Sequence, residues 1–263
     1  MSIDYLHGIR DFELDVAIRD FPSQATGGKE VRVLDLGAGT GRQAARLQQY
    51  GYSVIAVDMP SSAYANARIF PVQDYDGKNI PVEAQALDVV FSSNVLEHVA
   101  DLDVLLAETR RVLSRNGVAV HVLPTPAWRI WTTLTHFPWL VKRSISTVLG
   151  LRRTSATGPA EYSRGGFWAD LFPRRHGERG NAITEAWYFS SRWWSKAFAR
   201  AGFVVLATRP AGIFYTGSLL FGPRLRTDFR QWVSRFLGSS CRIYVLRPAG
   251  PAKNLSSSAN SES

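Results

Sequence analysis

Residues Val31–Arg42 read VRVLDLGAGTGR, and this stretch decides the fold. Its first half is a short, nearly continuous apolar run, which is typical of a parallel strand buried on both faces. Gly37, Gly39 and Gly41 follow, and glycine lets a backbone turn sharply and lie against a ligand. The helix expected over residues 43–50 presents its positive N-terminal end at the same place. The pattern therefore predicts a site for a polar ligand, unless the glycines form only a closely packed turn.

The spacing of the glycines distinguishes between ligands. Dinucleotide-binding loops follow G-x-G-x-x-G and place a pyrophosphate at the start of the helix, whereas this loop reads G-x-G-x-G. Asp35, two residues before the first glycine, would repel a pyrophosphate but can accept hydrogen bonds from an ammonium group. A second apolar strand, residues 53–57, ends in Asp58, whose carboxylate is placed to bind both hydroxyls of a ribose. A ligand with a ribose, a cationic amino-acid portion and no phosphate pair matches S-adenosylmethionine.

Further motifs resemble the class I S-adenosylmethionine-dependent methyltransferase family, in particular its broad type 11 group. These motifs are LDLGAGTG at 34–41, DGKNIP at 76–81, LDVVFSSNVLEHV at 87–99 and RRVLSRNGVAVHVLPTP at 110–126. The resemblance covers about residues 30–126 and resumes weakly near 190–248. It implies that Asp58 binds the ribose, that Asp76 holds the adenine amino group, and that the loop after strand four lies under the cofactor.

The resemblance and the strand tips together give a set of candidate site residues. The candidate cofactor-binding residues are Asp35, Gly37, Ala38, Gly39, Gly41, Asp58, Met59, Asp76, Gly77, Asn94 and Val95. The candidate catalytic residue is His98, beside Glu97, as a general base or a substrate ligand, with helix capping or packing as the alternative. We expect no metal site.

Three other residues with reactive side chains receive weaker assignments. His121 lies between valines in the expected fifth strand, so we expect a structural group of the core. His176 and Glu185 could contact a substrate, but a salt-bridge network within a loop explains them equally well.

Alternating strands and helices over residues 31–123 are the signature of a doubly wound sheet. We expect an α/β, Rossmann-like fold with a mostly parallel seven-stranded sheet, a cap inserted after strand five, and a final antiparallel hairpin. The expected parts are a helical lead-in at 1–30 with its helix near Asp11–Phe21, a cofactor-binding core at 31–123, an inserted substrate or cap region at 124–190, a last helix and strands at 191–248, and a disordered tail at 249–263.

Composition limits the class of protein further. The chain begins without a basic-then-apolar signal peptide, and no uncharged apolar run approaches the ~20 residues that span a bilayer. The single cysteine, Cys241, excludes an internal disulfide and a Cys-rich zinc site, and its place in an expected strand favours a buried structural thiol. We therefore expect a cytoplasmic protein, with a peripheral position at the inner face of the membrane left open.

The net charge of +9 is unevenly distributed along the chain. Residues 124–248 contain 19 Lys and Arg against 5 Asp and Glu, or +14, and the remainder contains 12 against 17, or −5. Such a basic half favours a phosphate-rich partner, namely nucleic acid, anionic lipid or a phosphorylated substrate. A well-solvated, arginine-rich surface is the alternative.

The expected cap contains a cluster of aromatic and basic residues. The aromatic members are Trp128, Trp131, Phe137 and Trp139, and the basic members are Arg129, Lys142, Arg143, Arg152 and Arg153. The aromatic residues could form the core of the cap, line an apolar substrate pocket, or enter a membrane surface while the basic residues meet lipid phosphates. The first interpretation is favoured.

We expect a methyltransferase that acts on a small-molecule, glycan or lipid-linked acceptor, at an oxygen atom. A nucleic-acid (RNA) methyltransferase is the main alternative, but Asn94 is followed by Val-Leu-Glu and not by the Pro-Pro-Tyr of base-amine enzymes, and Cys241 is far along the chain from the cofactor motifs. We therefore do not expect nucleic acid as a partner. A non-catalytic membrane- or partner-binding protein on the same scaffold is a third possibility, and the intact cofactor motifs argue against it.

Overall fold

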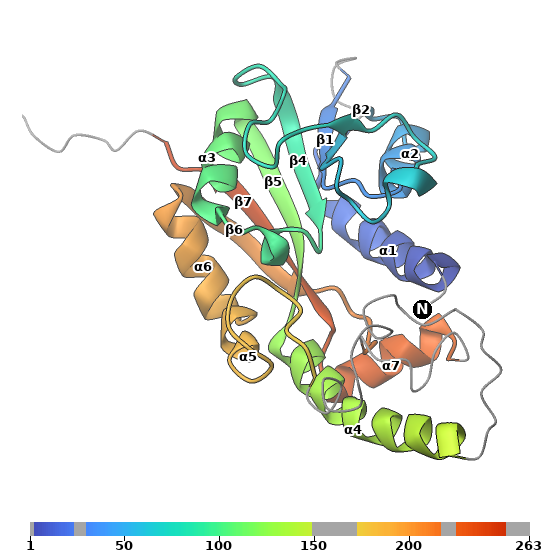
Figure 1. Ribbon diagram of the computed structural model, residues 1–263. Helices are drawn as coiled ribbons and strands as arrows, with labels where there is room; N and C mark the ends of the chain where they lie inside the picture. The colour runs from blue at the N-terminus through green and yellow to red at the C-terminus, as the bar shows by residue number, and fades with distance from the viewer. Residues whose placement is uncertain (1–2, 24–29, 149–172, 217–224, 251–263) are drawn as a thin grey trace, which may run out of the picture.

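The computed structural model describes residues 3–23, 30–148, 173–216 and 225–250 (Figure 1). Most of the tail expected at 249–263 lies outside the described residues, as do residues 149–172 of the expected cap. Among the described residues, no helix combines the length and the apolar character needed to cross a membrane.

A seven-stranded sheet forms the centre of the molecule, with the order β3-β2-β1-β4-β5-β7-β6. Its strands are β1 (Arg32–Leu36), β2 (Ser53–Asp58), β3 (Gln73–Asp74), β4 (Leu87–Ser93), β5 (Leu113–Pro124), β6 (Phe203–Pro210) and β7 (Cys241–Pro248). Strands β1 to β5 pair in parallel, and β7 runs antiparallel to both β5 and β6. The expected mostly parallel sheet and the antiparallel pairing of the last two strands are confirmed.

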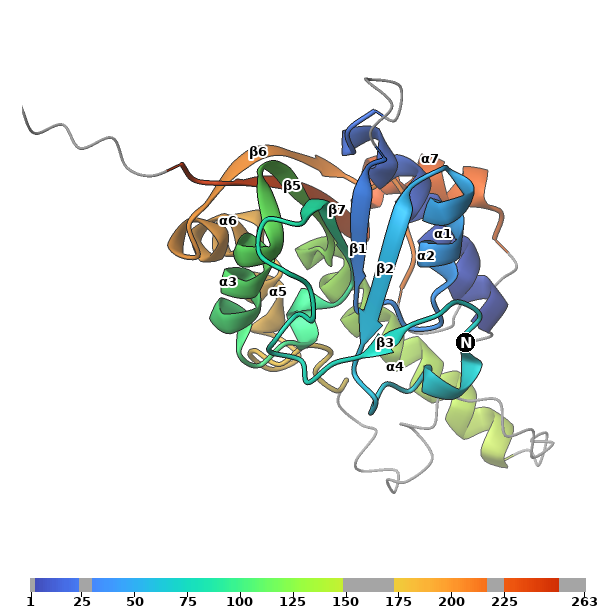
Figure 2. The ribbon, with the colours of Figure 1, turned by 90° about the horizontal axis from the view of Figure 1, so that it is seen from above.

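Helices cover both faces of this sheet (Figures 1 and 2). They are α1 (Ile3–Ala17), α2 (Arg42–Gln49), α3 (Leu102–Val112), α4 (Pro126–Val148), α5 (Glu185–Tyr188), α6 (Ser191–Arg200) and α7 (Thr227–Leu237). Successive residues of a strand point to opposite faces, so Val33 of β1 joins the core cluster with α1 and α2, whereas Leu34 joins the cluster with α3 and α6. Burial on both faces explains the continuous apolar runs of the sequence.

The first helix begins well before the position that the sequence suggested. It was expected near Asp11–Phe21, but α1 starts at Ile3 and ends at Ala17, with a 3-10 turn to Asp20. Tyr5, Ile9 and Phe12 lie about one helical turn apart and pack against the same core cluster. This tertiary contact outweighs the weak local signal of the first residues.

Two side chains inside the sheet have structural roles, as expected. His121 of β5 is fully buried, its Nδ1 lies 2.8 Å from Ser92 Oγ, and burial lowers its pKa to about 3, so the imidazole is neutral. Cys241 is also fully buried.

Candidate functional site

The glycine loop after β1 is shaped by close contacts that only glycine allows. Gly37, Gly39 and Gly41 all have positive φ, between 56° and 77°. A Cβ at Gly37 would lie 2.5 Å from a methyl carbon of Val95, and one at Gly41 would lie 2.6 Å from Phe70 Cβ. The loop therefore packs against the segment that follows β4, and two predicted site residues, Gly37 and Val95, are in contact.

Asp58, at the tip of β2, fixes the same loop. Its Oδ2 accepts a hydrogen bond from the Gly39 N–H at 2.9 Å, and its Oδ1 accepts one from the Met59 N–H at 2.8 Å. Each carboxylate oxygen has a second lone pair available for a ligand. The Gly37 and Ala38 N–H groups both donate to Val57 O, at 2.9 and 3.0 Å. The tips of β1 and β2 thus form one rigid unit.

The loops after β2 and β3 also meet. Met59 is 44% exposed, and its sulfur lies only 3.1 Å from the position of a Cβ at Gly77. Asp76 Oδ1 accepts from the Lys78 and Asn79 N–H groups, and its Oδ2 accepts from Asn79 Nδ2. These bonds, led by the Asn79 N–H, lower the pKa of Asp76. Because the carboxylate already shapes its own turn, its contact with an adenine amino group stays a prediction.

Asp35 is almost entirely buried, with 1% of its surface exposed. Burial, and then the charge of Asp58, raise its pKa to about 7, while a hydrogen bond with the backbone of Ala44 in α2 acts in the opposite direction. Its Oδ2 has no hydrogen-bond partner among the described residues. The contact of Asp35 with a ligand ammonium group therefore also stays a prediction.

Asn94, directly after β4, belongs to a buried polar network that the sequence did not indicate. Its φ is +55°, its Nδ2 lies 3.4 Å from Glu13 Oε2, and its Oδ1 accepts from Cys241 Sγ at 3.4 Å. Glu13 is fully buried, pairs with Arg10 at 2.6 Å, and accepts from Tyr215 Oη at 3.2 Å. The network ties α1 and β7 to the site loop. Only the Arg10–Glu13 spacing, which suits an ion pair on a helix, could have signalled it.

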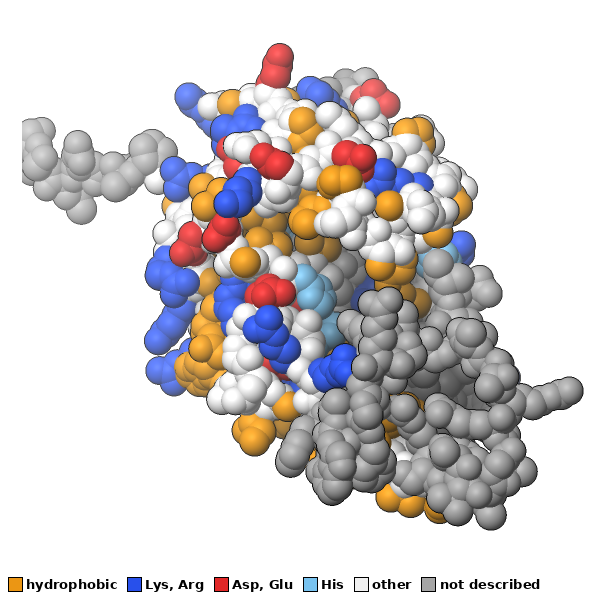
Figure 3. All heavy atoms as spheres, in the orientation of Figure 1, with side chains coloured by type: hydrophobic (Ala, Val, Ile, Leu, Met, Phe, Trp, Pro, Cys, Tyr) orange, Lys and Arg blue, Asp and Glu red, His pale blue; other side chains and the backbone are white. Residues whose placement is uncertain are grey.

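His98 lies beside two other ionisable groups. Its Nε2 is 3.8 Å from Glu97 Oε1, and His176 Nε2 is 4.0 Å from the same oxygen. The two imidazole rings contact each other edge to face, with centroids 4.6 Å apart. Figure 3 shows histidine side chains in a hollow on this face of the molecule. We call Glu97, His98 and His176 the acid–imidazole cluster.

Two members of the cluster, Glu97 and His176, have shifted pKa values. Glu97 is only 2% exposed, and neither carboxylate oxygen has a hydrogen-bond partner among the described residues. Burial raises its pKa to about 8, so the carboxyl is mostly protonated at neutral pH. Partial loss of hydration, followed by the charge of His98, lowers the pKa of His176, although its side chain is still 36% exposed. The side chain of His98 is 44% exposed, so it remains accessible to a substrate.

The donor atoms of the cluster all lie within 4.8 Å of one another. One carboxylate and two imidazoles are donors that divalent metal ions accept. The prediction that this chain has no metal site therefore stays a prediction.

The segment before α5 holds His176 in this position. Glu185 Oε1 accepts from the His176 and Gly177 N–H groups, at 2.6 and 2.7 Å, and Glu185 Oε2 lies 3.1 Å from Arg129 Nε. The Glu178 N–H donates to Glu97 O at 2.9 Å. Of the two interpretations of Glu185, the structure supports the salt bridge.

This arrangement excludes, for Arg129, one of the alternatives left open for the basic cap residues. Arg129 is only 2% exposed and is paired with Glu185, so it cannot meet lipid phosphates. Trp128 is 5% exposed and packs against His176 and Phe189. Because Trp and Arg occur both in cores and at membrane surfaces, their presence in the sequence did not distinguish the two.

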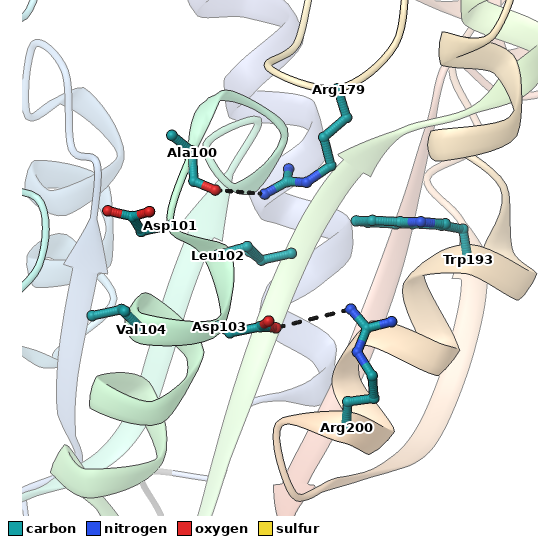
Figure 4. Close-up of a pocket in the computed structure, with 8 residues that line it drawn as sticks. All are labelled: Ala100, Asp101, Leu102, Asp103, Val104, Arg179, Trp193 and Arg200. Atoms are coloured by element: carbon teal, nitrogen blue, oxygen red, sulfur yellow. Dashed lines mark hydrogen bonds and ion pairs between the residues drawn. The ribbon is translucent and has the colours of Figure 1, made fainter.

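A separate surface pocket lies between the start of α3 and α6 (Figure 4). Arg179 reaches across it to the Ala100 carbonyl, and Arg200 lies 3.9 Å from Asp103. None of the predicted site residues lines this pocket, so it is distinct from the candidate site.

Comparisons with known proteins agree with this geometry. Residues 34–121 match the family model described as a methyltransferase domain. The ubiquinone biosynthesis O-methyltransferase of Bartonella quintana is 26% identical over 111 residues, which cover 39% of this chain and 45% of that protein. The chain thus spans less than half the length of this relative.

Solved structures share the fold across most of the chain. The S-adenosylmethionine-dependent methyltransferase from Mesorhizobium loti has a TM-score of 0.52 at 17% identity, over 90% of this chain and 97% of that one. The geranyl diphosphate C-methyltransferase from Streptomyces coelicolor has a TM-score of 0.51 at 15% identity, over 93% of this chain and 79% of that one. At such identities the likeness shows the fold alone.

The matched domain, the sheet order and the glycine loop together define the class of protein. Residues 34–121 form a methyltransferase domain of the class I S-adenosylmethionine-dependent type, as the motifs predicted. S-adenosylmethionine is the cofactor of this family.

Proposed function

We propose that the protein transfers a methyl group from S-adenosylmethionine to an oxygen atom of a small-molecule acceptor, which includes lipid-linked and glycan acceptors. The observation that carries this proposal is the acid–imidazole cluster, of which Glu97 and His98 lie two and three residues after Val95. Because Val95 packs against Gly37 and His98 follows it by three residues, we infer that the accessible imidazole of His98 reaches the acceptor beside the glycine loop. The relative from Bartonella quintana is named as an O-methyltransferase, which supports an oxygen acceptor.

The residues at the strand tips suit the proposed cofactor. Gly37 and Gly39 offer bare backbone, Asp58 offers free lone pairs to ribose hydroxyls, and Met59 beside Gly77 offers an exposed apolar surface to the adenine. When bound, the cofactor supplies a methyl group on a sulfonium, and its leaving group is a neutral sulfide. The protein then contributes mainly alignment of the acceptor with that methyl group.

A hydroxyl acceptor also needs a base, and His98 is the candidate. We propose that its imidazole takes the acceptor proton as the oxygen attacks. The buried Glu97, which is mostly neutral at pH 7 because of its raised pKa, does not fix the imidazole as a permanent cation. His176 packs edge-on against His98 and limits its rotation.

Calorimetry with S-adenosylhomocysteine and isotope-labelled methyl transfer test the proposal together. We expect the full chain to bind S-adenosylhomocysteine and to label a fraction of small molecules or lipids extracted from cells with methyl groups. His98→Ala should keep that binding and lose most of the transfer. Absence of binding would refute the cofactor assignment. Label that appears only in RNA would favour the nucleic-acid alternative.

A further inference from the structure

Helix α4 carries an exposed apolar face that the acid–imidazole cluster does not use. Its five side chains, which we call the α4 stripe, are 46 to 60% exposed: Ile130, Leu134, Phe137, Val141 and Ile145. At 100° per residue these positions fall within an arc of about 80°. They extend along about 22 Å of the helix. The other side of α4 is buried at Trp128 and Leu140, so the helix is amphipathic in the described part of the chain.

Helix α7 carries a second exposed apolar face. Phe229, Trp232 and Phe236 are 48, 53 and 71% exposed. The rings of Phe229 and Trp232 stack with centroids 5.7 Å apart, and the Trp232 and Phe236 rings are tilted with centroids 5.1 Å apart. They occupy an arc of about 60° on the helix. Arg226 precedes α7 and Arg235 lies in its last turn, and both are exposed. At 100° per residue the two arginines flank the three rings, which we call the α7 aromatic face.

The two helices lie at the same end of the molecule, away from β2 and β3 (Figure 1). A hydrogen bond connects the first turns of α4 to the end of α7: Trp131 Nε1 donates to Leu237 O at 3.0 Å. Monomeric proteins rarely expose so many large apolar side chains in continuous stripes, and such stripes mark interaction surfaces.

We propose that the α4 stripe and the α7 aromatic face dock on an anionic lipid surface. The charge of the surrounding chain selects this occupant: residues 124–248 contain 19 basic and 5 acidic residues. Apolar side chains enter the boundary of the acyl chains while flanking cations attract lipid phosphates. A second copy of the chain would bring two strongly basic regions together, which electrostatic repulsion opposes.

This inference goes beyond methyl transfer and does not depend on it. It shares only Phe137 with the contact that the sequence suggested. The other docking residues are the aliphatic members of the α4 stripe and the α7 rings, whereas Trp128 and Arg129 are buried.

Flotation of the full chain with vesicles tests the proposal. We expect binding to phosphatidylcholine vesicles that contain phosphatidylglycerol, weaker binding to phosphatidylcholine alone, and weakening by salt. The double variant Leu134→Ser/Val141→Ser should lower the partition coefficient by about tenfold or more. Ile183→Ser is the matched control, because Ile183 is 82% exposed and lies outside both faces; it should leave binding unchanged.

Other results would overturn the proposal. They are a parent protein that does not float with anionic vesicles, equal loss of binding in the control, or stripe variants that only convert a dimer to a monomer. Binding of S-adenosylhomocysteine reports on the folding of each variant. Its absence in the parent protein would count against the proposed function and not against lipid docking, so the two failures can be distinguished.

Discussion

Replacing Glu97 by Gln should stabilise the protein, and increasingly so as the pH rises. Glu97 is buried without a hydrogen-bond partner among the described residues, and burial raises its pKa from 4.5 to about 8. In the unfolded chain the carboxyl ionises near pH 4.5, whereas in the folded protein it stays protonated to about pH 8. Its contribution to stability is therefore fully present below pH 4.5 and is lost as the pH rises toward 8.

The size of the effect follows from the shift. One pKa unit corresponds to about 1.4 kcal/mol, so the free energy of unfolding of the parent protein should fall by about 3 to 4 kcal/mol between pH 5 and pH 8 through this group alone. The glutamine side chain of the variant has nearly the same shape as glutamate and does not ionise. The variant should match the parent at pH 5 and exceed it by about that amount at pH 8.

Urea unfolding of parent and variant at pH 5, 6.5 and 8, in the presence of EDTA, measures this difference. Comparing the two proteins at the same pH removes the contributions of ionisable groups that lie away from residue 97. Glu83→Gln, at an exposed carboxylate, is the control and should show a small, nearly constant difference. A stability difference for Glu97→Gln that does not grow with pH would refute the account of an uncompensated buried carboxyl.

Three further substitutions test the site. Gly37→Ala should weaken S-adenosylhomocysteine binding by more than about tenfold in calorimetry, because its Cβ would collide with Val95, whereas Gly51→Ala, with a similarly positive φ and open space around it, should not. Asp58→Asn should weaken binding by about tenfold, since charge-assisted hydrogen bonds are about twice as strong as neutral ones; unchanged affinity would exclude Asp58 from the ribose site. Arg129→Met should lower the free energy of unfolding by about 3 to 5 kcal/mol, because it leaves the buried Glu185 carboxylate without its cation, and adding Glu185→Gln should restore part of the loss.

The sequence predicts well those parts of the site that local chemistry determines. The strand, glycine loop and helix at residues 31–49 lie in one continuous segment, and each of its glycines has the positive φ that the pattern suggests. Asp58 ends β2 and bonds to Gly39, because neighbouring parallel strands end at the same edge of the sheet.

The remaining parts depend on contacts between distant segments, which local patterns do not encode. His176 reaches His98 only because Glu185 and Arg129 hold its loop against α4. The same reason explains why the sequence left the role of Arg129 open. Its sequence neighbours are aromatic residues, which occur equally in a cap core and at a membrane surface, and its partner lies in another helix. The α4 stripe has the helical period, but the sequence does not tell which side of an amphipathic helix meets the protein core.

The energetics of Glu97 distinguish the acid–imidazole cluster from ordinary packing. A fully buried carboxyl with unsatisfied oxygens opposes folding at neutral pH, and an apolar residue of similar size at that position would not. The backbone of Glu97 and then Arg10 act to lower the pKa of Glu97, but burial outweighs both, and Glu13 acts in the same direction as burial. The surroundings of Glu97 therefore disfavour its ionised form.

Groups with strongly shifted pKa values concentrate at functional sites. Glu97 lies beside the accessible imidazole of His98 and next to Val95, which packs on the glycine loop. That combination is expected of a site where protons move, and it is why we assign acceptor chemistry to this cluster rather than to the pocket between α3 and α6.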